Sequence, residues 1–174
     1  EGAVDDANAI LDYGMRYRDW DFFLPFFASF NASYFNRDFK AAAHYMQRAA
    51  DLSGSPNFSR LASRYMYEAG QADFAVTYLD VMIAATRDPL EKRLYSARRD
   101  AIRALSDIQT AVTQYTSVHG ELPKELNALT VAGLLDTIPV DPYGGEFYID
   151  KTGRVRSTSK MTYQQTDSDE VKQP

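Results

Sequence analysis

The sequence predicts a mainly α-helical protein: a solenoid of antiparallel helix pairs, then a long C-terminal helix, then a small β-hairpin as a cap. Three observations predict this fold class. An apolar helix pattern recurs when the chain is shifted by 35 residues against itself. A stripe of apolar residues, three or four positions apart, continues through residues 94–115. A short apolar run at residues 147–149 is followed by a glycine-containing turn and a second short run.

Composition limits the class of protein. The chain has 174 residues, a net charge of −5, 45% hydrophobic residues and no cysteine. Without cysteine, it has no disulfide, thiolate zinc ligand or cysteine nucleophile. The acidic balance argues against a nucleic-acid binder, which would usually carry a basic surface. No apolar run approaches the roughly 20 residues of a membrane-spanning helix, so we expect membrane contact only through a removed segment before Glu1.

The repeat is carried by residues that correspond at the shift of 35. In each helix, a small residue is followed four positions later by a larger apolar one, and three positions later by another small one. This spacing is one face of a helix, and the small residues let a neighbouring helix approach closely. The three corresponding sets are Ala7, Leu11 and Gly14; Ala42, Met46 and Ala49; and Thr77, Val81 and Ala84.

A second set of helices is expected between these. Residues 22–35 and 59–69 are both apolar with helical periodicity. Pro25 fits a first helical turn, where its missing N–H costs little. Ser59 is predicted as an N-cap, and Gly70 as a helix stop. The result is helix, turn, helix, repeated over the first 88 residues.

The stretches "SYFNRDFKAAAHYMQRAADLSGSP" and "RYMYEAGQADFAVTYLDVMIAATRDP" resemble tetratricopeptide (TPR) repeats. That family has aromatic and small residues on its first helix, a Gly-x-aromatic turn, and Ala, a large residue and Ala on its second. Here Arg37 stands where the turn glycine is expected; Gly70 with Ala75 fits a shift of 33, and Asp73 a shift of 35. Residues 4–21 resemble only the second helix of a repeat, so the partner helix is expected upstream. The resemblance implies a TPR-like surface that binds a protein or peptide.

A long helix is expected over residues 89–119. Asp88 and Pro89 fit its N-cap and first position, and Gly120 fits its end. Its apolar stripe consists of Leu94, Ala97, Ala101, Leu105, Ile108, Val112 and Tyr115. Because about 31 residues of helix would span roughly 45 Å, this helix is longer than the repeat helices before it.

Residues 120–157 are expected to form a short helix and a β-hairpin. The short helix is predicted over 126–135, with Leu126, Leu129, Leu134 and Leu135 buried. Residues 147–149 predict one strand, 151–153 the turn and 154–157 the return strand. Residues 158–174 are polar and aperiodic, which predicts a tail.

The segment "YTSVHGELPKELNALTVAGLLDTIPVDPYGGEFYID" resembles the soluble part of type II secretion pseudopilins. There a helix ends in a Gly-x-x-Pro segment, and an Asp-Pro-aromatic-Gly turn leads into a small sheet. The chain lacks the N-terminal apolar helix and the processing site of a pilin subunit. The resemblance implies a bacterial cell-envelope protein, membrane-anchored through the removed N-terminal segment.

Candidate catalytic and metal-binding residues are few. His44 and His119 are the only histidines, and no nucleophile-elbow, Walker, dinucleotide or His-Glu-x-x-His motif occurs. Asp141, Glu146 and Asp150 allow two interpretations: a calcium site, as in related pseudopilin loops, or a simple turn beginning at Asp141. We prefer the turn, because calcium takes about six or more oxygen ligands. We therefore expect no cofactor, no metal and no enzymatic activity.

The run "WDFFLPFFASFNASYF" supplies the candidate partner-binding residues. Its aromatic residues cover more than one helical stripe. One interpretation is a helix buried between two neighbours. The other is that Phe27, Asn31 and Tyr34 face a groove, where the rings give contact area and the Asn amide pairs with the backbone of an extended peptide.

Three functional hypotheses follow. The preferred one is a protein–protein interaction scaffold that uses a TPR-like surface in the bacterial envelope. The second is an accessory or assembly factor of a secretion or type IV pilus-like system that docks through the C-terminal hairpin. The third is an enzyme with an unrecognised site, because a fold alone never fixes a function.

Overall fold

The computed structural model describes residues 2–159. These residues contain seven helices and a two-stranded antiparallel sheet, which confirms a mainly helical protein with a small β-hairpin. The chain divides into two compact units, Glu1–Ser96 and Ala97–Pro174, and the division falls inside the long helix α6 (Pro89–His119). The polar tail predicted over 158–174 lies outside the described residues from position 160 onward.

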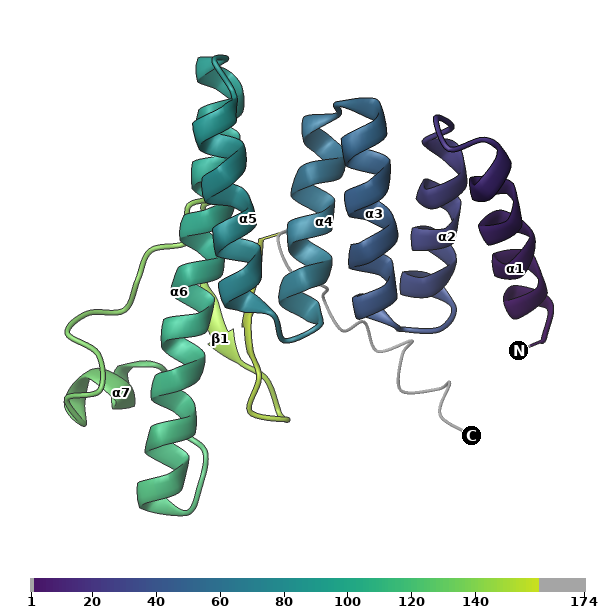
Figure 1. Ribbon diagram of the computed structural model, residues 1–174. Coiled ribbons are helices and arrows are strands. Elements are labelled where there is room, and N and C mark those ends of the chain that lie inside the picture. The colour runs from purple at the N-terminus through teal and green to yellow at the C-terminus, as the bar shows by residue number, and fades with distance from the viewer. Residues whose placement is uncertain (1, 160–174) are drawn as a thin grey trace. The chain divides into compact units, whose positions relative to one another are not determined.

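Unit 1 is a row of helices, and consecutive helices lie side by side (Figure 1). The helices are α1 (Gly2–Tyr17), α2 (Phe23–Tyr34), α3 (Phe39–Ser53), α4 (Pro56–Glu68) and α5 (Ala72–Ala85), followed by the start of α6. Helices α2, α4 and α6 begin 33 residues apart, and so do α3 and α5. The chain therefore repeats a helix pair at a fixed interval.

The shift of 35 is wrong for the last helix pair. Met46 of α3 is fully buried, and its counterpart at a shift of 33, Leu79, is fully buried too. Val81, its counterpart at 35, is exposed. Helix α5 is apolar on both faces, so a self-comparison finds an apolar residue at either shift, and only packing against α4 selects the register.

Local signals set where the helices begin. The Asp88 carboxylate accepts the Leu90 N–H at 2.7 Å, as expected of an N-cap. The N-cap predicted at Ser59 is wrong: α4 begins at Pro56, which fits a first turn, and Ser59 lies buried one turn inside. Arg37 and Gly70, which are 33 residues apart, both take a left-handed backbone before the next helix, with φ of 53° and 77°.

The helices of unit 1 pack through small residues. The buried face of α2 consists of Pro25, Ala28, Ser29, Ala32 and Ser33. The buried face of α3 is mainly alanine: Ala42, Ala43, Met46, Ala49 and Ala50. Ser29 Oγ donates to the Ala42 carbonyl at 2.7 Å, a contact possible only where two helix backbones approach closely. The predicted role of small residues is thus seen between α2 and α3.

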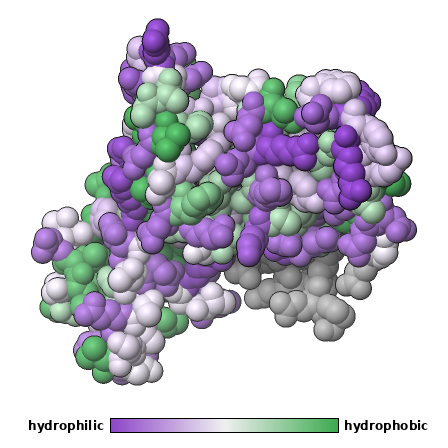
Figure 2. Space-filling view, in the orientation of Figure 1, coloured by the Kyte–Doolittle hydropathy of each residue, from purple (hydrophilic) through white to green (hydrophobic). Residues whose placement is uncertain are grey.

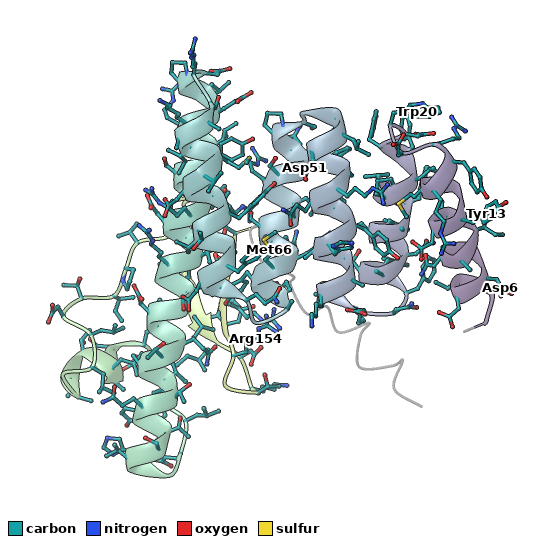
Figure 3. All side chains as sticks on the ribbon, in the orientation of Figure 1. Asp6, Tyr13, Trp20, Asp51, Met66 and Arg154 are labelled. Carbon is teal, nitrogen blue, oxygen red and sulfur yellow. The ribbon has the colours of Figure 1, made fainter. Side chains whose placement is uncertain are left out.

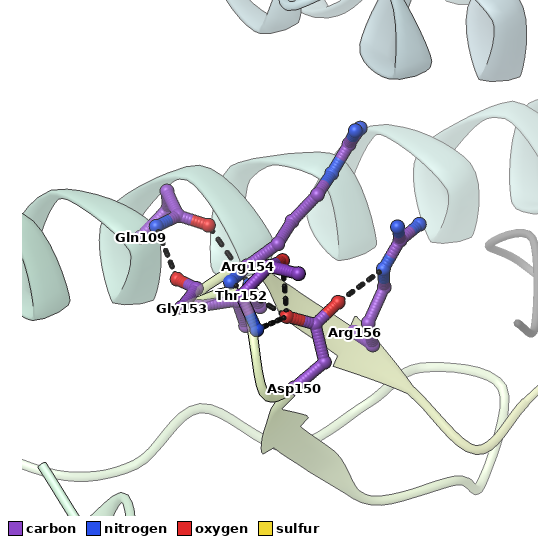
Figure 4. Close-up of polar contacts among 7 residues, drawn as sticks. Gln109, Asp150, Thr152, Gly153, Arg154 and Arg156 are labelled. Atoms are coloured by element: carbon purple, nitrogen blue, oxygen red, sulfur yellow. Dashed lines mark hydrogen bonds and ion pairs between the residues drawn. The ribbon is translucent and has the colours of Figure 1, made fainter. Parts of the chain in front are cut away.

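Unit 2 combines the C-terminal part of α6 with α7 (Asn127–Val131), β1 (Phe147–Ile149) and β2 (Val155–Ser157). Phe147 pairs with Ser157 and Ile149 with Val155. The fully buried residues are larger than those of α2: Ile102, Leu105, Ile108, Val112, Leu129 and Val155. The Gln109 side chain donates to the Gly153 carbonyl at 3.0 Å and accepts the Val155 N–H at 2.8 Å, which holds the hairpin against α6 (Figure 4).

The short helix is shorter than predicted. It ends at Val131 rather than near Leu135, because Gly133 takes a left-handed backbone with φ of 68°. Of the four leucines expected to be buried, Leu129 is fully buried, and the other three are only half-buried.

Candidate partner-binding surface

Helix α2 carries its aromatic side chains on its outer face. Phe23, Phe27, Phe30 and Tyr34 are 54%, 50%, 45% and 61% exposed. Their spacing of four, three and four residues puts them in one row along the helix. We call this row the aromatic stripe. The chain has no charged residue from position 22 to position 36, so the stripe has no charge of its own.

The rings of the stripe support one another. Phe23 and Phe27 stack with centroids 6.4 Å apart, and Phe30 and Tyr34 stack at 5.3 Å. Phe35 meets the edge of Tyr34 at 5.0 Å. Aromatic pairs at such distances attract one another, and each ring has few rotatable bonds. The stripe is therefore largely ordered before any partner binds, which lowers the entropy cost of binding.

The local sequence explains why the large residues lie outside. Phe26 and Phe22 turn toward Phe58 of α4, with ring centroids 5.3 and 6.0 Å away. The remaining inward positions hold only small residues, because α1, α3 and α4 leave no room for rings there. The interpretation of this helix as buried on all sides is therefore wrong.

The structure places the three predicted binding residues in two settings. Phe27 and Tyr34 lie together in the aromatic stripe. Asn31 lies at the edge of the stripe beside α1, and its amide donates to Asn8 Oδ1 at 2.9 Å. Asn31 thus ties α2 to α1, and its amide hydrogens are only partly available to an extended peptide.

A second exposed apolar row, which the sequence analysis missed, lies on α1. Ile10, Tyr13 and Tyr17 are 71%, 60% and 66% exposed, and the two tyrosine rings are 4.9 Å apart. We call these three residues the α1 row. Figure 3 shows Tyr13 pointing away from α2. The spacing of three and four residues was the available signal, but only the structure shows that no described helix covers it.

The rest of the surface differs from these two rows. The face of unit 1 shown in Figure 2 is mainly hydrophilic, with hydrophobic side chains scattered over it. Scattered apolar residues are ordinary on protein surfaces, whereas contiguous ones mark binding sites. The aromatic stripe is therefore the better candidate for a functional surface.

The acidic residues of the hairpin are engaged in local structure. The Asp141 carbonyl accepts the Gly144 N–H at 2.9 Å, and its carboxylate accepts from Tyr143 N–H and Ser157 Oγ. The turn beginning at Asp141 is thus confirmed. Asp150 lies at the other end of the hairpin. Within residues 2–159, no three His, Asp or Glu side chains gather in a group that could hold a metal ion.

Asp150 is the centre of a small polar network (Figure 4). Its carboxylate accepts from the Thr152 N–H and the Arg154 N–H at 2.9 and 3.0 Å, and from Arg156 Nε at 3.2 Å. Burial alone would raise the pKa of Asp150, but these hydrogen bonds together hold it below its usual value. The ionised carboxylate therefore stabilises the turn.

The two histidines lie in different helices. His44 of α3 is beside Tyr45, and His119 at the end of α6 is 4.2 Å from the Tyr115 ring. Neither is grouped with other candidate ligands in the described part of the chain.

Comparison with protein-family models, with curated proteins and with solved structures finds no match to this chain. Among the helices over residues 2–159, none is both long enough and apolar enough to cross a bilayer.

Proposed function

We propose that this chain is a TPR-like protein-interaction scaffold whose binding surface is the aromatic stripe of α2. One observation carries the proposal. Four exposed aromatic residues share one face of an uncharged helix whose opposite face is already packed. Aromatic residues are enriched among those that dominate binding energy, and exposed contiguous apolar surface marks interaction sites.

The helix arrangement supports the scaffold part of the proposal. Helix pairs begin at a 33-residue interval, close to the roughly 34 residues of a TPR repeat. Stacked pairs form an extended surface without needing a long-range core, and such surfaces commonly bind other proteins. The envelope location and the membrane anchor belong to the same proposal and are supported by the pseudopilin resemblance.

The chemistry of the stripe favours a partner with apolar side chains at helical or extended spacing. An uncharged row of rings offers contact area and no ion pairing, so specificity comes from shape. The net charge of −5 disfavours nucleic acids and anionic membranes as partners, because both are negatively charged. We propose no enzymatic activity and no cofactor.

The test compares substitutions in the stripe with a matched control. Phe27→Ala and Tyr34→Ala should each weaken partner binding at least about thirtyfold, as expected where truncation of a central aromatic costs about 2 kcal/mol. Phe74 of α5 is 54% exposed, so Phe74→Ala removes an equally exposed ring outside the stripe and should change nothing. Partners would be captured with a photo-crosslinker at position 27, and their affinity measured by calorimetry. Equal binding by all variants would reject the proposal.

One observation favours the second candidate, an assembly factor docking through the hairpin region. Val131 and Val140, on either side of the loop before β1, are among the most exposed apolar residues of the described chain. Deleting residues 139–160, or substituting Val140→Asp, should then abolish complex formation and leave the helices of unit 1 intact. If complexes still form with the Val140→Asp variant, docking does not use this region.

A further inference from the structure

The outer face of α1 differs from the faces of the other helices in unit 1. Its inner face is held by three polar contacts. Asn8 accepts from Asn31 at 2.9 Å, Asp12 accepts from the Tyr45 hydroxyl at 2.8 Å, and the Met15 carbonyl accepts from Arg48 at 3.2 Å. These contacts fix the rotation of α1 about its axis. The α1 row is therefore held on the outer face and does not turn inward.

Terminal helices of a stacked array ordinarily have a polar outer face. The α1 row is apolar and more exposed than the aromatic stripe. Three large apolar residues on one face of a helix about 24 Å long form an incomplete helix–helix interface, because helices pack through such rows.

The charges of α1 indicate what covers this face. Asp5 and Asp6 are exposed in its first turns, and Arg16 is exposed in its last. Arg18 is already paired with Asp21 at 2.9 Å. Asp5 and Arg16 make no ion pair with any other described residue. At about 100° per residue, Asp5 and Arg16 lie on the same flank of the α1 row, at opposite ends.

This arrangement is self-complementary. When two copies of α1 lie antiparallel about a two-fold axis, each flank meets the same flank of the other copy with its ends reversed. Asp5 of one copy then faces Arg16 of the second copy, and the reverse pair forms by symmetry. The axis passes close to Ile10, so Ile10 and Tyr13 of both copies pack at the centre.

We propose that two copies of this chain associate through α1, antiparallel, with the α1 row at the centre and Asp5–Arg16 ion pairs at both ends. This proposal does not depend on the proposed function of the aromatic stripe. A single helix–helix contact is smaller than the roughly 1,200 Å² of a standard interface, so the dimer is weak, with a dissociation constant of about 1–100 μM. Dimerisation would place two aromatic stripes in one particle, which raises the avidity for a repetitive partner.

The decisive experiment exchanges charges between copies. Asp5→Arg alone puts two positive charges opposite each other at both ends of the interface, and Arg16→Asp alone puts two negative charges there. Each variant should dimerise at least about tenfold more weakly than the unmodified chain. An equimolar mixture of the two variants pairs one end positive with positive and the other negative with negative only within each copy's own kind; between the two kinds, every contact joins opposite charges.

The mixture should therefore form a heterodimer in preference to either homodimer. In that heterodimer, the arginine introduced by Asp5→Arg meets the aspartate introduced by Arg16→Asp, and the native Asp5 of the second variant meets the native Arg16 of the first. Both end pairs are restored, so the affinity should be close to that of the unmodified chain. Sedimentation equilibrium of the whole chain from about 1 μM to 1 mM measures all four cases.

Two controls separate this result from misfolding and from a different interface. Asp73 is the exposed first-turn acid of α5, so Asp73→Arg makes the same charge change away from α1 and should leave the dissociation constant unchanged. Circular dichroism should show equal helix content for all variants. Added salt should weaken the dimer of the unmodified chain, because the end pairs are exposed.

Three results would overturn the proposal. The first is an unmodified chain that stays monomeric to about 1 mM, which would mean that another segment or partner covers α1. The second is a mixture of the two variants that fails to associate although each is folded. The third is a dimer that is lost with Phe27→Ala but kept with Ile10→Ala, which would place the interface on the aromatic stripe instead.

Discussion

The helices of unit 1 and the hairpin of unit 2 keep their positions by different means. Helix α2 meets α3 through alanine and serine, so the backbones themselves come close, and its large residues lie outside. In unit 2 the buried residues are large aliphatic ones, and the hairpin is also held by polar side chains, chiefly Gln109 and Asp150. Large apolar residues serve stability in unit 2, whereas in α2 they are left for recognition.

This difference gives a rule for reading the chain. Where the inward positions of a helix hold small residues and the outward ones hold rings, the rings contribute little to folding. Removing them should affect binding, and enlarging the small residues should affect stability. Where the inward positions hold Ile, Leu and Val, the usual relation between size and stability applies.

The largest effect is expected in unit 2. Ile108 is fully buried, and Ile108→Ala should destabilise the protein by about 2–5 kcal/mol, because it removes apolar contact and leaves a cavity. Denaturant unfolding followed by circular dichroism measures the loss. Val118, on the same helix and strongly exposed, is the control, and Val118→Ala should cost less than about 0.5 kcal/mol. Equal costs would mean that burial does not distinguish the two positions.

The next effect reverses the usual order of size on α2. Ala28 is fully buried, so Ala28→Leu should destabilise unit 1 by about 1–3 kcal/mol by forcing α2 away from its neighbours. The adjacent Phe27→Ala should change stability by less than about 0.5 kcal/mol, because the ring is half exposed. Both are measured by urea unfolding. If Phe27→Ala proves the more damaging, the stripe belongs to the core and the rule fails.

Much of this fold could be predicted because its signals are local. The start of α6 follows from Asp88 and Pro89, whose cap and ring geometry act within one turn. The strands at 147–149 and 155–157 follow from alternation beside a glycine turn. In each case, the residues that determine the element lie within a few positions of it.

What could not be predicted depends on neighbours distant in sequence. The register of α5 is ambiguous because both of its faces are apolar, and packing on α4 decides that Leu79 is buried and Val81 exposed. The candidate surface had the same difficulty. Periodicity placed Phe27 and Tyr34 on one face, but the bond between Asn31 and Asn8 joins residues 23 positions apart.

A smaller effect is expected from acidifying the hairpin. Because the pKa of Asp150 is lowered in the folded state, its contribution to stability is present above the ordinary carboxyl pKa of about 4 and is lost as the pH falls below it. Amide hydrogen exchange at Thr152 and Arg154 should therefore accelerate under acid before exchange in α6 does.

The control for acidification is Asp150→Asn. This variant keeps the shape of the side chain but removes its charge. It should lower hairpin stability by about 1 kcal/mol at neutral pH and abolish the additional loss in acid. A variant that retains the acid response would assign that response to another carboxylate.

The smallest effect tests whether the helix pairs of unit 1 are true repeats. Arg37 and Gly70 occupy the same place, 33 residues apart, and both have a left-handed backbone. That conformation costs a residue with a Cβ about 1 kcal/mol, part of which glycine gives back through greater freedom in the unfolded chain. Arg37→Gly should therefore stabilise the protein by about 0.5 kcal/mol, and Gly70→Ala should destabilise it by about 1 kcal/mol, both read from thermal unfolding.

The two substitutions are compared because only one of them depends on the backbone alone. A Cβ at Gly70 meets no atom within 4 Å, so the cost of Gly70→Ala would come from its backbone conformation. Opposite signs at the two equivalent positions would show that both turns obey one geometry. A destabilising Arg37→Gly would instead show that the side-chain contacts of Arg37 outweigh the strain of its backbone, and the equivalence of the two turns would then be limited to their shape.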